Sequence, residues 1–183
     1  MAQLSFKPTS DKRWQGIQRH YFTLYMIKNL LILPFVGVVI AESVSMKKWG
    51  EEDRVSNNGA NVKFWERIGA ALIPDVALTF VIAFGIVKQR WHPIAALVTS
   101  IVYMALWLFV TLLNALVAYS GEVVYFSEVK TLNKWQSMCY AEAGFQGAIT
   151  LLYMIMLGFA SKGLHEWRKA RNHRASTVEP SKA

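Results

Sequence analysis

The sequence predicts an all-α fold, a four-helix transmembrane bundle that runs up-down-up-down. Hydrophobic residues make up 54% of the 183 residues and charged residues only 17%, and the charges lie mostly between long apolar runs. A bilayer core about 30 Å thick needs a helix of roughly 20 apolar residues. Four runs reach this length, at 22–44, 68–87, 93–119 and 137–160. The chain thus divides into an N-terminal segment (1–21), a four-span domain (22–161) and a basic tail (162–183).

The N-terminal segment is polar and basic, and the first apolar run is longer than the core of a signal peptide. We therefore expect no cleaved signal and an N-terminal segment on the cytoplasmic side. The connection at 88–92 is so short that the second and third spans must be antiparallel neighbours. The connection at 122–135 mixes polar and aromatic residues and is expected to lie along the membrane interface. The polar end of the chain, from Arg171 onward, is expected to be disordered.

The basic residues favour one orientation. With both termini cytoplasmic, twelve Lys and Arg near the spans lie inside and seven lie outside. Six of the seven tryptophans also fall at span ends, where indole rings prefer the interface. These are Trp14, Trp91 and Trp167 on the inner side and Trp49, Trp65 and Trp135 on the outer side. We predict a multi-pass protein of the plasma membrane or an endomembrane, with cytoplasmic N- and C-termini.

The net charge of +8 indicates a partner of negative charge. Because the basic residues cluster at span ends, anionic lipids at the cytoplasmic face explain them better than nucleic acid does, and no nucleic-acid partner is expected. The residues of the tail assigned to this lipid contact are Lys162, Arg168, Lys169, Arg171 and Arg174.

Residues for catalysis or metal binding form no known motif. The four histidines lack metal-site spacing, so no metal and no cofactor is expected from them. The single cysteine, Cys139, is predicted to lie across the membrane from the histidines, without a base to activate it, and is interpreted as a small packing residue. We identify no catalytic residue.

Polar residues inside the apolar spans are the most unusual feature. They are Glu42, Asp75, Asn114, Glu142 and Gln146, and the predicted topology puts them all in the outer half of the bundle. A carboxylate in hydrocarbon is costly, so these groups must face one another, other polar atoms or water. Two hypotheses remain open: hydrogen-bond partners that fix the packing of the bundle, or a small site for a cation, a proton or a polar ligand. In either case we expect Asp75 to contact Glu142 or Asn114.

Lys28 lies in the first span, and its long side chain is expected to extend back to the headgroups. The small-residue spacings Gly37-x-x-x-Ala41 and Ala143-x-x-x-Gly147 suit close helix packing within the bundle. A dimerisation surface is the alternative, so a homo- or hetero-oligomer is also possible.

Two segments in the later half of the chain carry a family-like pattern. They are Trp91-His-Pro-Ile-Ala-Ala-Leu-Val-Thr-Ser, followed by Trp107, and Cys139-Tyr-Ala-Glu-Ala-Gly-Phe-Gln-Gly-Ala-Ile-Thr-Leu-Leu-Tyr. Mainly over 91–160, the chain resembles small fungal MARVEL-type four-span membrane proteins. The resemblance implies a four-helix bundle with cytoplasmic ends and a role in membrane organisation, membrane apposition or vesicle traffic, without catalysis.

The sequence therefore favours a non-enzymatic integral membrane protein that organises membrane domains or membrane traffic. The alternative is a small membrane enzyme or transporter subunit that uses the polar cluster in the outer half. A third possibility is an accessory subunit of a larger complex.

Overall fold

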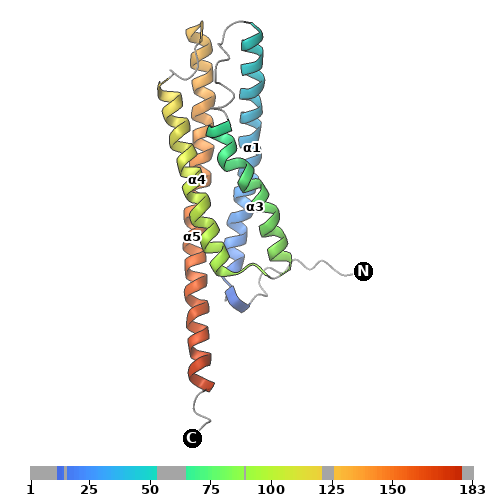
Figure 1. The fold of residues 1–183 in the computed structure, drawn as a ribbon, viewed down its shortest axis with the longest axis vertical. Helices are drawn as coiled ribbons and strands as arrows, with labels where there is room; N and C mark the ends of the chain where they lie inside the picture. The colour runs from blue at the N-terminus through green and yellow to red at the C-terminus, as the bar shows by residue number, and fades with distance from the viewer. Residues whose placement is uncertain (1–11, 15, 53–64, 89, 121–125, 179–183) are drawn as a thin grey trace, which may run out of the picture.

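The protein is a bundle of four long helices (Figure 1). The structure, a computed structural model, describes residues 12–14, 16–52, 65–88, 90–120 and 126–178. The main helices are α1 (Gln18–Glu51), α3 (Ala70–Val87), α4 (Pro93–Ser120) and α5 (Val129–Val178). A short 3-10 turn, η1 (Lys12–Trp14), precedes α1, and a π-helical turn, η2 (Trp65–Gly69), leads into α3.

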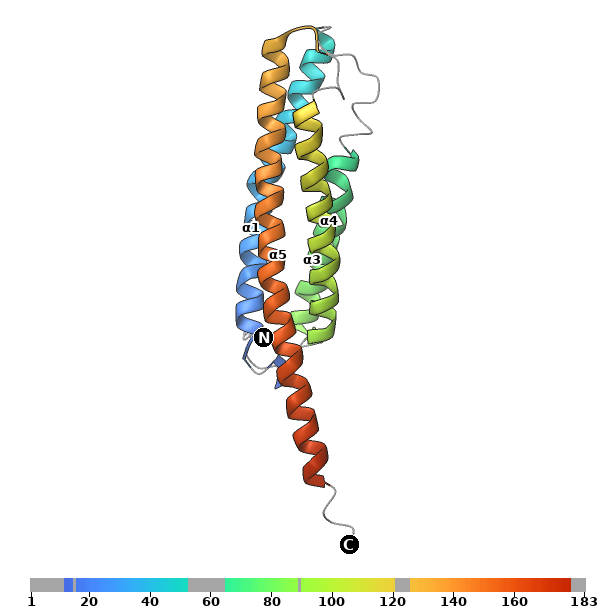
Figure 2. The same ribbon diagram turned by 90° about the vertical axis from the view of Figure 1, so that its left-hand side faces the viewer.

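The helices alternate in direction. From the end of the bundle where α1 begins, here called the inner end, α1 and α4 run toward the outer end, and α3 and α5 run back (Figures 1 and 2). Among the described residues, four helical segments are long and apolar enough to cross a membrane: Gln18–Glu51, Trp65–Gly85, Pro93–Ser120 and Val129–Asn172. Each overlaps one of the predicted spans, although the second segment ends at Gly85, two residues before the predicted end of its span. This confirms the predicted all-α bundle with four candidate spans.

A seven-residue repeat selects the buried face of each helix. In α1 the repeat comprises Tyr21, Lys28, Phe35, Glu42 and Trp49, and in α5 it comprises Trp135, Glu142, Ile149 and Met156. All these side chains are buried. Residues seven apart lie on the same face of nearly parallel, slightly supercoiled helices, which is the packing expected in a bundle. Polar residues in this repeat are therefore directed into the interior.

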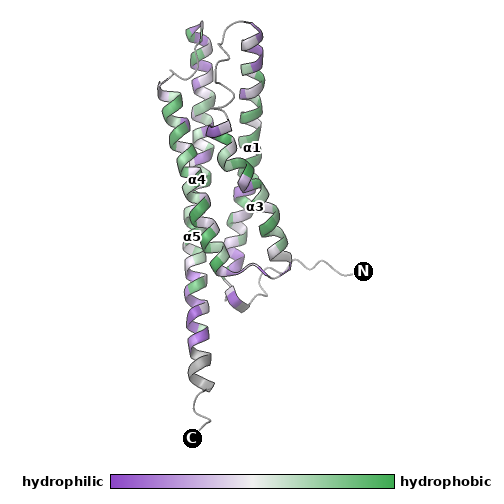
Figure 3. Cartoon of the chain, in the orientation of Figure 1, coloured by the Kyte–Doolittle hydropathy of each residue, from purple (hydrophilic) through white to green (hydrophobic). Residues whose placement is uncertain are grey.

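The outer faces of the helices are apolar. Green segments cover most of the bundle in Figure 3, and large hydrophobic side chains on these faces are exposed. Examples are Leu30 (68% exposed), Phe80 (72%), Phe84 (63%) and Leu116 (64%). An apolar surface of this extent would be unstable in water, whereas a lipid environment accommodates it. The fold is therefore that of an integral multi-pass membrane protein.

The tail departs from the prediction. Disorder was expected from Arg171 onward, but α5 stays helical to Val178 and extends past the other helices at the inner end (Figure 2). The expectation was wrong for 171–178, where Arg, Ala and other residues that tolerate a helix continue the long α5. Residues 179–183 lie outside the described part of the chain, as do 53–64 and 121–125 in the outer connections. The predicted interfacial segment at 122–135 is helical from Val129.

The small-residue pairs differ in their surroundings. A Cβ added to Gly147 would contact Thr111 of α4 at 3.9 Å, whereas a Cβ added to Gly37 would meet open space. Gly147 thus belongs to the packing of α4 against α5.

The orientation in the membrane remains a prediction, which accessibility labelling can test. We expect cysteines placed at Gln3 and Ser181 to be shielded from an impermeant thiol reagent in intact cells, and a cysteine at Asn58 to react, because an even number of crossings puts both ends on one side. If the protein lies in an internal membrane, permeabilising only the plasma membrane makes both termini reactive and leaves Asn58 shielded. The native Cys139 is fully buried, so the parent chain serves as the background control. Labelling of either terminus in intact cells would contradict the four-span topology with both ends inside.

Candidate functional site

The polar side chains of the interior gather at two levels. The central network consists of Lys28 (α1), Asp75 (α3), Trp107 (α4) and Tyr153 (α5). The outer network consists of Glu42 (α1), Arg67 (η2), Asn114 (α4), and Trp135, Cys139, Glu142 and Gln146 (α5). Every residue of the two networks is at most 3% exposed. Both networks therefore join all four spans in the interior of the bundle.

Asp75 is the centre of the first network. Its Oδ1 lies 2.6 Å from Lys28 Nζ and accepts a hydrogen bond of 2.7 Å from the Tyr153 hydroxyl. The indole Nε1 of Trp107 donates to Oδ2 over 2.8 Å. Both carboxylate oxygens are thus engaged by groups from the three other helices. The +1 and −1 charges of Lys28 and Asp75 cancel, and this makes their burial tolerable.

Aromatic rings complete the surroundings of the Lys28 ammonium group. Its Nζ lies 5.0 Å from the ring centroid of Tyr25 and 5.5 Å from that of Tyr153, within cation–π range. The prediction that Lys28 extends back to the headgroups was wrong, because a buried counter-charge lies within its reach.

Arg67 is the centre of the outer network. One guanidinium nitrogen, Nη2, contacts Glu42 Oε1 at 2.5 Å and lies 3.7 Å from Glu142 Oε2. The other, Nη1, donates to Asn114 Oδ1 over 2.7 Å and also contacts the sulfur of Cys139. The planar fork of arginine suits this arrangement because it directs several N–H donors to acceptors on different helices.

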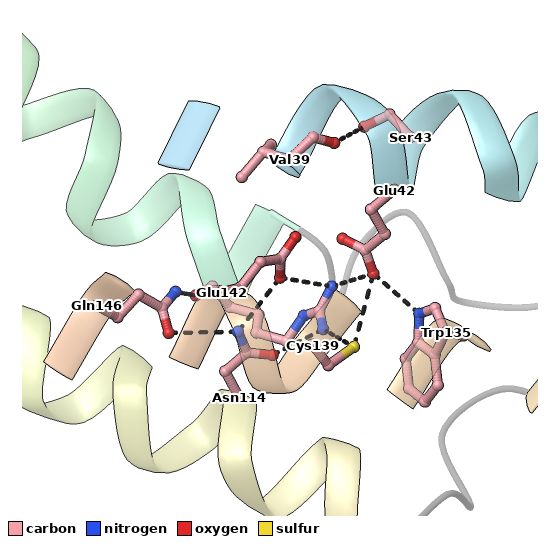
Figure 4. Close-up of polar contacts among 9 residues, drawn as sticks. Val39, Glu42, Ser43, Asn114, Trp135, Cys139, Glu142 and Gln146 are labelled. Atoms are coloured by element: carbon pink, nitrogen blue, oxygen red, sulfur yellow. Dashed lines mark hydrogen bonds and ion pairs between the residues drawn. The ribbon is translucent and has the colours of Figure 1, made fainter. Parts of the chain in front are cut away.

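Two amide side chains link the acids of this network. Asn114 Nδ2 lies 3.3 Å from both Glu142 Oε2 and Gln146 Oε1. Gln146 Nε2 donates in turn to the backbone carbonyl of Arg67 over 3.2 Å. The amides thus connect α4 and α5 to the turn that carries Arg67 (Figure 4).

Trp135 and Cys139 lie beside Glu42. The Trp135 indole donates to Glu42 Oε1 over 2.9 Å, and Cys139 Sγ lies 3.8 Å from the same oxygen (Figure 4). Trp135 was predicted to face the membrane interface, but it is 2% exposed. It is turned inward because it lies on the heptad face of α5, seven residues before Glu142.

The π-helical turn η2 explains how Arg67 enters the interior. A π-turn is wider than an α-turn and shifts side chains relative to the helix that follows. Arg67, Ile68 and Gly69 are all buried there. A Cβ at Gly69 would lie 2.7 Å from the Trp65 ring, so the turn requires glycine at this position.

The structure separates the five polar residues that the sequence singled out. Glu42, Asn114, Glu142 and Gln146 lie together in the outer network, whereas Asp75 lies in the central one. Its partner Trp107 is near the middle of α4, so Asp75 lies deeper than predicted. The expected contact of Asp75 with Glu142 or Asn114 was wrong, because its hydrogen bonds and ion pair go to other residues.

Sequence reasoning missed the two basic residues that the networks are built around. Lys28 was interpreted as interfacial, and Arg67 was counted among the charges of the first outer connection. The seven-residue spacing of Tyr21, Lys28 and Phe35 is a signal that would have placed Lys28 inside. No comparable signal exists for Arg67, because its π-turn breaks the helical period.

Together, the fold and the two networks define the class: a four-span α-helical membrane protein whose interior contains charged residues that are joined by hydrogen bonds and ion pairs. Comparison with known proteins finds no matching family model, no similar curated protein and no similar solved structure. The resemblance to MARVEL-type proteins stays a prediction.

Proposed function

We propose that this chain is a non-enzymatic integral membrane protein that organises membrane domains or membrane traffic. The observation that carries the proposal is the extension of α5 past the bundle, residues 162–178, here called the arm. Lys162, Arg168, Lys169 and Arg171 are exposed on the arm, and the side chain of Arg174 lies outside the described set. A rigid basic helix at the inner end is suited to contact an anionic surface.

The root of the arm is fixed to the bundle. The Trp167 ring packs edge-on against His92 in the connection between α3 and α4, with ring centroids 4.8 Å apart. From Trp167 to Val178 the helix advances about 16 Å at 1.5 Å per residue. An arm of this length carries its charges beyond the inner end of the bundle, toward a second membrane or a lipid-bound partner.

Anionic lipid is the partner that suits the arm best. Each basic residue that comes close to an anionic leaflet adds roughly 1 kcal/mol of attraction, which decays within a Debye length of about 10 Å. Four exposed charges can therefore hold two membranes together weakly and reversibly. Such contacts fit organisation of membranes better than a catalytic role.

The interior supports the same proposal. In the central network both oxygens of Asp75 are engaged, and in the outer network Arg67 is shared among several acceptors. Side chains that form hydrogen bonds and ion pairs with each other stabilise a bundle, whereas catalysis requires groups that a substrate can reach.

A vesicle-clustering experiment tests the proposal. Neutral proteoliposomes that contain the full chain are expected to cluster acceptor vesicles containing phosphatidylserine, and to do so less as salt is raised. The triple variant Arg168→Glu, Lys169→Glu, Arg171→Glu is expected to abolish clustering. Light scattering and lipid-dye energy transfer between the two vesicle populations measure it.

The matched control reverses three exposed charges at the opposite end, in the variant Lys47→Glu, Lys48→Glu, Lys130→Glu. It is expected to cluster vesicles like the parent chain. Equal clustering of neutral and anionic acceptors, or loss of clustering only in the control, would contradict the role of the arm.

A further inference from the structure

The outer network contains more negative charge than its basic residue can balance. Glu42 and Glu142 are 1% and 0% exposed, and Arg67 is the cation that contacts both of them. With both carboxylates ionised, the formal charge of these three groups is −1. The central network has no such excess, since Lys28 and Asp75 form a balanced pair.

One oxygen of each glutamate is also left over. Among the described residues, Glu42 Oε2 and Glu142 Oε1 have no hydrogen-bond partner, although both are buried. Figure 4 shows these two oxygens turned toward the space between the carboxylates, while the other oxygen of each group makes the hydrogen bonds. Buried polar atoms without partners are rare in folded proteins and are expected to meet a ligand, an ion or water.

The sulfur of Cys139 lies close to both carboxylates, 3.8 Å from Glu42 Oε1. Its Sγ and one carboxylate oxygen from each of Glu42 and Glu142 lie within 4.8 Å of one another. A tetrahedral Zn²⁺ ion with bonds of about 2.0 to 2.3 Å separates its ligands by roughly 3.5 Å. To reach that separation the three side chains would have to rotate, and the Arg67 guanidinium, which now contacts all three, would have to make room for the ion.

We propose that Glu42, Cys139 and Glu142 bind one divalent transition-metal ion, with Zn²⁺ as the ion whose ligand preferences they fit. Thiolate and carboxylate ligands together suit Zn²⁺, whereas Ca²⁺ and Mg²⁺ require more oxygen ligands and do not favour sulfur. On binding, the Cys139 thiol releases its proton to solvent as the metal–sulfur bond forms. The three ligands then carry −3, Arg67 carries +1 and the ion +2, so the site becomes neutral.

Neighbouring groups are positioned to support this site. Arg67, Trp135 and Asn114 hold the carboxylates through the oxygens that already have partners, which leaves the other oxygens directed at the ion. Arg67 Nη1 can keep its contact with the metal-bound sulfur. Groups that orient ligands in this way raise metal affinity. Because Glu42 is on α1 and the other two ligands are on α5, the ion would join these helices at the outer end.

Metal binding to the purified full-length protein tests the proposal. After treatment with a chelator, the protein in detergent is titrated with Co²⁺, which gives a sulfur-to-metal charge-transfer absorption when a thiolate binds it. We expect this band to saturate at one Co²⁺ per chain, to disappear when Zn²⁺ is added, and Zn²⁺ to raise the thermal unfolding midpoint.

Two variants and one control locate the site. Cys139→Ser is expected to eliminate the charge-transfer band, and Glu142→Gln to weaken Zn²⁺ binding by more than about tenfold. Glu51→Gln, an exposed position on α1, is expected to behave like the parent chain. If Cys139→Ser does not fold, Glu142→Gln decides the question, because it keeps the size of the side chain and removes only the charged ligand.

The opposite results would overturn the proposal. The first is that the parent chain gives no charge-transfer band with Co²⁺. The second is that Zn²⁺ raises the unfolding midpoint of both variants as much as that of the parent chain. The third is that the stability of the protein depends on pH but not on Zn²⁺. The last result would mean that a proton shared by Glu42 and Glu142 balances the charge.

Discussion

Replacement of Arg67 by Met is expected to lower the free energy of unfolding by about 3 to 5 kcal/mol. The variant leaves Glu42 and Glu142 buried in the interior without the cation that contacts both, and Asn114 Oδ1 loses its charged donor. Burial of unpaired charge is among the most destabilising changes known for single substitutions. Unfolding in mixed detergent micelles, followed by helical circular dichroism, measures the loss.

Three further variants isolate the cause. Arg67→Lys keeps the charge but loses the planar fork, so we expect an intermediate loss. Adding Glu42→Gln and Glu142→Gln to Arg67→Met should recover part of the stability, because no unpaired charge remains. Arg168→Met, at an exposed position of the arm, should have almost no effect. An Arg67→Met variant as stable as this control would contradict the role of Arg67.

The second large effect is expected at Asp75. Replacing it by Leu leaves Lys28 without its counter-charge and removes the acceptor of Trp107 and Tyr153, so a loss of about 3 to 5 kcal/mol is expected. Lys28→Met should cost less, because Asp75 keeps its two other donors. Thermal unfolding and detergent-induced unfolding measure the free energy of unfolding of the two variants. The reverse order, with Lys28→Met the more damaging change, would contradict the geometry of the central network.

The fold could be predicted because a bilayer leaves few choices. Four apolar runs of sufficient length, separated by charged connections, define four helices, and the short connection at 88–92 makes two of them antiparallel neighbours. These constraints depend on length and composition, which the sequence gives directly. Helix ends were less predictable, since α5 continues as a helix through polar residues to Val178.

The site could be predicted only in part, for a physical reason. A buried acid is visible in an apolar run, so Glu42 and Glu142 could be identified as unusual. Their partners were harder to identify, because a long basic side chain near a span end can either reach headgroups or turn inward. For Lys28 and Arg67 the choice depends on which acid the neighbouring helices bring within reach, and this follows from packing rather than from local sequence.

Double-mutant cycles on Asp75 test the separation of the interior into two networks. The cycle of Lys28→Met with Asp75→Asn should give a coupling energy above about 1 kcal/mol, because the two side chains form an ion pair 2.6 Å long. The cycle of Asp75→Asn with Glu142→Gln should be additive within roughly 0.5 kcal/mol, because these acids belong to different networks. Strong coupling of Asp75 to Glu142, together with additivity for Asp75 and Lys28, would contradict the two-network interior.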